Sequence, residues 1–160
     1  MSLAIDDDRV ELACFEVGGQ LFAIDVQQIR EIVRSQRVTP LPKAPGLIEG
    51  VIDLRGAIVP VVDLGRALLG QPGSDGARAR IAIVEVEGLV FGLRVDAAAE
   101  VLAVAGRDVE GPPALVAQAG YDAVRAVVRR EGAVPALVLS LEHLLESVYR
   151  SALGAPDEER

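Results

Sequence analysis

The sequence predicts an all-β fold that consists of two small β-barrels packed together and a C-terminal α-helix. Short apolar stretches rich in valine follow one another along the chain, and Gly or Pro turns separate them. One long helical pattern occurs, close to the C-terminus. Residues 12–26 and 81–96 share the same order of strand, turn, strand and aspartate, which is a weak internal repeat. The repeat suggests that the barrel occurs twice.

Local signals in the first part of the chain predict strands joined by tight turns. Gly18-Gly19 is a hairpin signal between two apolar stretches, and Asp25 is a candidate N-cap. Three prolines in residues 39–46 predict an ordered loop. The expected order is strands at 10–17 and 21–26, a helical turn through Ile29, an extended stretch at 31–35 and the loop at 39–46.

The most apolar stretch, 48–64, contains two strands that meet at a turn from Asp53 to Gly56. Gly56 can adopt the positive φ that hairpin turns often require. Arg55 then lies on a rigid hairpin tip and points outward. There it either solvates the turn or anchors a partner, as arginine often does at interfaces. Pro60 cannot donate to a ladder, so its strand is an edge strand or carries a bulge.

A short helix follows the hairpin, and a break in the pattern follows the helix. Asp63 is placed to cap this helix and Gly70 to close it. Residues 71–80 gather Gly, Pro, Ser and Asp without an apolar anchor, which predicts a mobile loop or a boundary.

The second half repeats the order of the first half. A strand, the turn at Glu87-Gly88 and another strand are followed by 97–105, where Glu100-Val101 corresponds to Glu31-Ile32. Further strands are expected around 123–131 and 133–140. Ser140 is expected to cap a helix that Gly154 ends, and residues 155–160 to form a frayed acidic tail. Residues 1–160 are thus one domain with barrel regions at about 10–70 and 80–153, and whether these exchange strands is open.

Charge and composition argue against several classes of protein. The chain of 160 residues has a net charge of −8 and one lysine, Lys43, so it is a poor ligand for nucleic acid or for anionic lipid. Neither a signal peptide nor a membrane-spanning stretch is recognisable, which makes the cytoplasm the expected compartment. Cys14, the single cysteine, is expected to be a buried small hydrophobe.

The sequence predicts no enzyme, no metal site and no cofactor. His143 is the single histidine and has no second His or Cys with which to build a metal site. Residues 65–70 begin like a P-loop, but Gln71 stands where the loop needs lysine. A nucleic-acid-binding barrel would need a basic, aromatic face, whereas only 3% of the residues are aromatic.

Several motifs resemble the signature of CheW-like domains, the adaptors of bacterial chemotaxis arrays. They are IEGVIDLRGAIVPVVDL at 48–64, FAIDVQQIREIV at 22–33, FGLRVDAAAEVL at 91–102 and ALVLSLEHLL at 136–145. The resemblance, over roughly 10–153, implies two SH3-like five-stranded barrels without catalytic activity. It also implies partners: the cytoplasmic tip helices of chemoreceptors, the regulatory domain of a CheA-type histidine kinase and other CheW-like domains.

The resemblance further implies which residues contact these partners. Matching positions are Ile29, Glu31, Gly50, Arg55, Gly56, Ala98 and Val101. Each has a structural alternative: Ile29 and Val101 as core residues, Glu31 as a solvated charge, Gly50 as part of a bend only. Asp53 stands where many members carry Asn. The basic run at 125–130 either protects a strand edge or tunes partner choice. The expected function is a stand-alone coupling adaptor, with a scaffold or array-filling protein of a non-motility pathway as the alternative.

Overall fold

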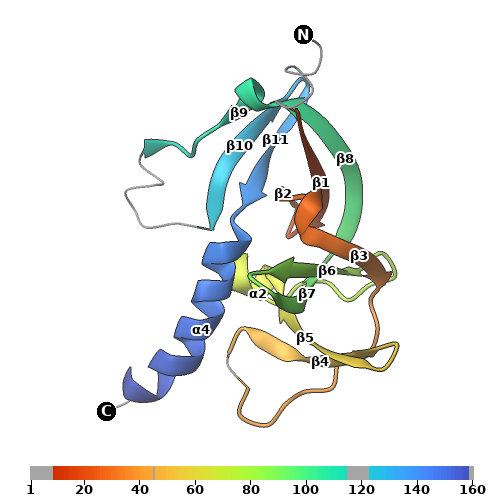
Figure 1. Cartoon of the computed structure of the whole chain (residues 1–160), viewed down its shortest axis with the longest axis vertical. Coiled ribbons are helices and arrows are strands. Elements are labelled where there is room, and N and C mark those ends of the chain that lie inside the picture. Colours follow the sequence, from red (N-terminus) through yellow and green to blue (C-terminus); the bar gives the residue numbers. More distant parts are fainter. Residues whose placement is uncertain (1–8, 45, 115–122, 159–160) are drawn as a thin grey trace.

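The computed structural model describes residues 9–44, 46–114 and 123–158, and it shows two curled β-sheets with a long helix beside them (Figure 1). Sheet A has the order β8-β1-β2-β11-β10-β9, with β1 (Arg9–Val17), β2 (Gln20–Asp25), β8 (Ala97–Ala105), β9 (Val109–Glu110), β10 (Val124–Arg130) and β11 (Ala133–Leu139). Sheet B has the order β3-β6-β7-β5-β4, with β3 (Ile29–Arg34), β4 (Ile48–Leu54), β5 (Ala57–Asp63), β6 (Arg80–Val86) and β7 (Leu89–Val95). The predicted all-β fold with a C-terminal helix is confirmed, and the two-residue strand β9 takes sheet A beyond the expected five strands.

Both sheets are built on the same plan, in which a parallel contact joins two antiparallel hairpins. In sheet A, β2 of the β1–β2 hairpin pairs with β11 of the β10–β11 hairpin. In sheet B, β7 of the β6–β7 hairpin pairs with β5 of the β4–β5 hairpin. A further strand flanks each sheet, β8 beside β1 and β3 beside β6. Each sheet therefore combines strands from both halves of the chain.

Tight turns fix the register of the hairpins. The turns at Gly18-Gly19, Arg55-Gly56 and Glu87-Gly88 have positive φ at both residues. This backbone matches the right-handed twist of the flanking strands and therefore suits a two-residue hairpin. The turns predicted from the sequence at these places are confirmed.

The strands are apolar along most of their length because many of them are buried on both faces. In β1, Ala13, Phe15 and Val17 point into a seam between the sheets, while Leu12 and Cys14 point into the interior of sheet A. The seam also contains side chains from β7 and from the C-terminal helix, among them Phe91, Leu93, Leu141 and Leu144. A third cluster fills the interior of sheet B, with Ile52, Val59, Val61, Ile81 and Ile83.

Side-chain caps begin α2 and α4, as the sequence predicts. The carboxylate of Asp63 accepts the Gly65 N–H at 3.0 Å at the start of α2 (Leu64–Leu69), and Gly70 closes this helix with φ +73°. Ser140 Oγ accepts the His143 N–H at 3.3 Å at the start of α4 (Leu141–Glu158). The predicted end of α4 at Gly154 is wrong, because one glycine costs a helix only about 1 kcal/mol and does not have to stop it.

Pro60 lies in an interior strand, so the prediction of an edge strand is wrong. β5 is placed between β4 and β7, and the bulge of this hairpin lies between Ile48 and Gly50. Pro60 is tolerated because Val51, its partner on β4, makes its hydrogen bonds with Thr39 instead. The Val51 N–H donates to the Thr39 carbonyl at 2.9 Å, and the Val51 carbonyl accepts from the Thr39 N–H at 2.8 Å. The parallel pairing with β7 begins only at Val61, which keeps its N–H.

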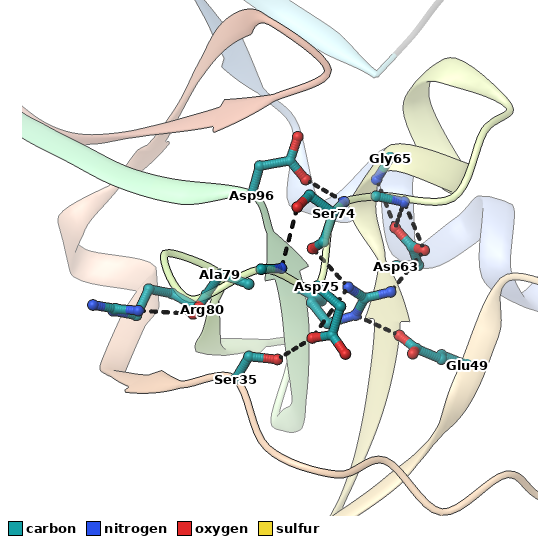
Figure 2. A network of polar contacts seen from close by, with 12 residues as sticks. Ser35, Glu49, Asp63, Gly65, Ser74, Asp75, Ala79, Arg80 and Asp96 are labelled. Atoms are coloured by element: carbon teal, nitrogen blue, oxygen red, sulfur yellow. Dashed lines mark hydrogen bonds and ion pairs between the residues drawn. The ribbon is translucent and has the colours of Figure 1, made fainter.

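Residues 71–79, here called the strap, are held largely by polar groups (Figure 2), and Ala79 at their end is buried. The Gly73 N–H donates to both oxygens of Asp63, each at 3.1 Å, and the Ser74 N–H donates to Asp96 at 2.7 Å. Ser35 Oγ donates to Asp75 at 2.9 Å. The sequence predicts a mobile loop or a boundary here from its Gly, Pro, Ser and Asp, and this local pattern does not show that Asp63 and Asp96, 10 and 22 residues away from their donors, hold the strap.

Candidate functional site

The β4–β5 hairpin presents Arg55 at its tip, as the sequence predicts. Arg55 has φ +51°, and the Gly56 N–H donates to Asp53 at 2.8 Å, which makes the turn rigid. A positive φ costs an ordinary L-residue about 1–2 kcal/mol, and Asn, Asp or Gly would fit this position better. The side chain of Arg55 is 68% exposed. An exposed arginine kept at a strained position is a candidate contact residue.

Arg55 is not isolated, because it pairs with Glu31 of β3. β3 and β4 form the opposite edges of sheet B, so this ion pair spans the gap between the edges of the curled sheet. A bulge between Ile29 and Glu31 interrupts the pairing of β3 with β6 at this point. Bulges re-aim side chains, and this one lies directly beside the carboxylate that meets the hairpin tip.

Sheet A contains a counterpart of this arrangement in the second half of the chain. Glu100 of β8 accepts from Arg130 at 2.7 Å, and Arg130 is the last residue of β10, directly before the Glu131-Gly132 turn of the β10–β11 hairpin. The pairing of β8 with β1 is again irregular next to the acidic residue, between Ala13 and Phe15. The two ion pairs thus occupy similar places, a flanking strand and the end of a hairpin, although Arg130 lies one residue before the position that corresponds to Arg55.

Exposed apolar side chains accompany both ion pairs. Ile58 on β5 and Val134 on β11 follow the two tips and are 64% and 62% exposed. Val101 on β8 is 63% exposed, next to Glu100. A hollow of about 310 Å³ adjoins the second pair and is lined in part by Leu21, Ala99, Glu100, Arg130 and Val134. Apolar groups next to a charged anchor form the kind of surface that protein partners bind.

The other predicted residues have different positions. Ile29 is partly buried and packs against the seam, and Ala98 is exposed on β8. Gly50 is buried, and a Cβ on it would lie 2.2 Å from the Thr39 carbonyl oxygen, so glycine is needed for the close approach of residues 38–39 to β4. The structure therefore brings Glu31, Arg55 and Gly56 together, places Ala98 and Val101 on sheet A, and gives Gly50 and Ile29 packing roles.

Sequence analysis did not select Glu100, Arg130 and Val134. The internal repeat carries a signal for Glu100, because it aligns Glu100 with Glu31, but none for Arg130, because Glu131 takes the place of Arg55 before the glycine of the turn. The basic run at 125–130 is largely neutralised within the chain, since Arg129 pairs with Glu110 of β9 and Arg130 with Glu100. The bond to Glu110 and its charge raise the pKa of Arg129.

A charge network centred on Arg94 joins β7 to β4, to β5 and to the strap. Arg94 of β7, 7% exposed, donates to Glu49 at 2.8 Å, to Asp63 at 3.1 Å and to the Ser74 carbonyl at 2.9 Å. Figure 2 shows the carboxylates of Glu49 and Asp63 turned toward this centre. Burial lowers the pKa of Arg94, but the bond to Glu49 and the charges of three carboxylates outweigh it and raise the pKa. Among the residues that the structure describes, no group of three His, Cys, Asp or Glu could hold a metal ion.

Comparisons with known proteins agree with this architecture. The sequence model of one protein family, described as the CheW-like domain, matches residues 11–149. The chain belongs to the CheW-like domain family. It is 35% identical over 150 residues to "Chemotaxis protein CheW" of Rhizobium meliloti, which covers 94% of this chain and 90% of that protein. It is 32% identical over 149 residues to "Chemotaxis protein CheW" of Treponema pallidum, with 91% and 87% covered.

A solved structure and a further relative extend the family likeness. The crystal structure of scaffolding protein TtCheW from Thermoanaerobacter tengcongensis aligns with a TM-score of 0.76 at 29% identity, and covers 86% of this chain and 92% of that one. "Protein FrzA" of Myxococcus xanthus is 29% identical over 145 residues, with 90% of each chain covered. The CheW-like fold of the chain, with its paired sheets and C-terminal helix, therefore occurs in a known scaffolding protein.

Proposed function

We propose that this CheW-like protein is a non-catalytic signalling adaptor that couples chemoreceptors to a CheA-type histidine kinase. Its relatives carry the name chemotaxis protein CheW, and its structural neighbour is a scaffolding protein. The observation that carries the proposal is the pairing of Arg55 with Glu31 at an exposed, strained hairpin tip. Such a tip is built for contact with a macromolecule and not for chemistry on a small substrate.

The two sheets offer two related contact surfaces on one body. The surface around Arg55 and Glu31 lies on sheet B, and the surface around Arg130 and Glu100 lies on sheet A. We assign these surfaces to the regulatory domain of the kinase and to other CheW-like domains, because similar barrels offer complementary edges. Ala98 and Val101, exposed on β8, are assigned to the apolar contact with the tip helices of chemoreceptors.

The adaptor works in the cytoplasm in this proposal, next to membrane receptors and without entering the bilayer itself. No helix within residues 9–44, 46–114 and 123–158 is long and apolar enough to cross a membrane. An adaptor that binds two partners shifts their equilibrium only if it prefers one arrangement of them. Many weak contacts of this kind suffice in an array, because each raises the effective concentration for the next.

Substitution of Arg55 tests the proposal. Arg55→Glu places a like charge against Glu31 and is expected to weaken kinase binding by ~1–3 kcal/mol, as at interface hot spots. Arg55→Asn removes the anchor but suits the positive φ, so it is expected to weaken binding while keeping or raising the urea midpoint. Isothermal titration against the regulatory domain of a cognate kinase and against a receptor tip measures the effect.

Arg30→Glu is the matched control, because it reverses a charge on β3, the strand that carries Glu31, and breaks only the exposed pair with Glu85. Circular dichroism verifies that each variant is folded. If folded Arg55→Glu and Arg55→Asn bind both partners as tightly as the unaltered chain, the assignment of this tip to an interface is wrong.

A further inference from the structure

An apolar hollow of about 220 Å³ opens between α4 and sheet B, away from both ion pairs. Val62, Phe91, Leu145 and Val148 form its floor, and all four belong to the seam between the sheets. Leu89 and Tyr149 form its rim and are 42% and 52% exposed. The hollow is thus an end of the seam that the described part of the chain leaves open. Its size suits one large apolar side chain.

Acidic side chains line a second hollow directly beside the first. This hollow of about 300 Å³ shares Leu145 and Tyr149 with the apolar one, and it is lined by Glu87, Glu142 and Glu146. Glu146 pairs with Arg150 at 3.2 Å, and Glu142 accepts from the neutral amide of Gln28 at 3.2 Å. Glu87 lies in the β6–β7 turn with φ +54°. His143 also lines this hollow, and of its three carboxylates Glu146 is the one that has an ion pair among the described residues, so the rim keeps a negative charge.

We propose that this face docks an amphipathic helix of a partner protein, which inserts one large apolar side chain and places Lys or Arg one turn away. Along α4, the acidic residues Glu142 and Glu146 are one helical turn apart, and so are the apolar residues Leu145 and Tyr149. The acidic and apolar positions therefore lie side by side on one face of the helix. A helix packed along α4 presents matching side chains at the same spacing. Residues of the two ion pairs line neither hollow, so this site is separate from the proposed kinase contact.

Charge complementarity selects this occupant over the alternatives. A second copy of the chain, with its net charge of −8, would bring another acidic surface to an acidic rim. An anionic membrane would be repelled in the same way. A basic helix is attracted instead, and its charged positions give a preference that an apolar hollow alone cannot give.

Two synthetic helical peptides with the same Leu and Phe face test the proposal, one with lysines and one with glutamates one turn from the Phe. Each is titrated into the isotope-labelled full chain, and amide chemical shifts are recorded. The lysine peptide is expected to bind saturably and to shift Leu89, Leu145 and Tyr149. The glutamate peptide is expected to bind at least about tenfold more weakly, and added salt to reduce the difference.

Variants of exposed rim residues localise the binding without disturbing the core. Leu89→Ser and Tyr149→Ala are each expected to weaken the lysine peptide about tenfold. Combining Glu142→Gln with Glu146→Gln is expected to remove most of the preference for lysine over glutamate. Leu41→Ser is the matched control, because Leu41 is 44% exposed, as Leu89 is 42% exposed, but it lines neither hollow; this variant is expected to leave binding unchanged.

The proposal is overturned by any of three results with folded protein. One is the absence of saturable shifts with the lysine peptide, and another is equal binding of both peptides. The third is self-association, or binding to anionic phosphatidylserine vesicles, that sedimentation detects and that Leu89→Ser abolishes. The occupant of the hollow would then be a second copy of the chain or a membrane. None of these outcomes bears on the Arg55 contact, which is measured with different partners.

Discussion

Replacing Arg94 by leucine is expected to destabilise the fold more than replacing any exposed arginine. The change removes the donor to Glu49 and Asp63 and leaves the Asp63 carboxylate, itself buried, without its counter-charge. Breaking a buried pair from one side costs about 3–5 kcal/mol, which is a large part of a total stability of about 5–15 kcal/mol. With an m-value of about 2 kcal/mol/M, the urea midpoint falls by roughly 2 M.

Two further variants identify the physical cause of this loss. Arg30→Leu breaks only the exposed pair with Glu85 and is expected to cost less than about 1 kcal/mol. Adding Asp63→Asn to Arg94→Leu removes the unpaired charge but keeps a side chain that can cap α2, so part of the stability is expected to return. If Arg94→Leu costs no more than Arg30→Leu, or if Asp63→Asn brings no recovery, the network does not stabilise the fold as argued.

Two smaller predictions follow from buried positions. Gly50→Ala is expected to lose ~1–3 kcal/mol of stability in urea unfolding, because its Cβ would lie 2.2 Å from the Thr39 carbonyl oxygen. Gly76→Ala is expected to change little, because the nearest atom to its added Cβ is Ser74 Oγ at 3.4 Å. Equal losses in the two variants would contradict the steric argument. Burial, with a contribution from the charge of Glu100, raises the pKa of Cys14 above its ordinary value of 9.0, although Arg130 lowers it. The unfolded chain therefore releases the thiol proton before the folded chain does, so stability falls as pH rises above 9.0. Urea midpoints at several pH values are expected to fall less steeply for Cys14→Ala, and parallel slopes would speak against this contribution.

Local features of the fold could be predicted because their causes lie within a few residues of sequence. Arg55-Gly56 and Glu87-Gly88 carry their turn chemistry in themselves, and Asp63 and Ser140 lie directly before the helices that they cap. The pairing of hairpins has no such signal. β2 meets β11 through contacts such as Phe22 with Leu137, more than a hundred residues apart in the chain, and uniformly apolar strands do not specify which neighbour they join.

The buried polar groups could not be predicted for a related reason. Arg94 looks like an ordinary surface charge in the sequence, as Glu49 and Asp75 do, because charged residues are rarely buried unless paired. Of the three, Arg94 is buried, Glu49 is partly buried and Asp75 is exposed. Only the fold brings them together, and the same contacts order the strap that sequence analysis expected to be mobile or a boundary.

The candidate site could be predicted in part. The hairpin tip at Arg55 was recognisable, whereas Arg130 had no such signal, because it lies one residue before the turn position that Arg55 occupies.

Hydrogen bonds between the sheets bear on how the proposed adaptor transmits a signal. Asp96, directly after β7 of sheet B, accepts from the Gly18 N–H in the β1–β2 turn of sheet A at 2.8 Å and from the strap at Ser74. The strap is in turn bonded to Asp63 and Arg94 in sheet B. These bonds add to the apolar seam, so the tips at Arg55 and Arg130 are carried by one cross-linked body. Such a body holds the two surfaces in one fixed arrangement, which is what an adaptor needs if binding at one surface is to favour one arrangement of the partner at the other.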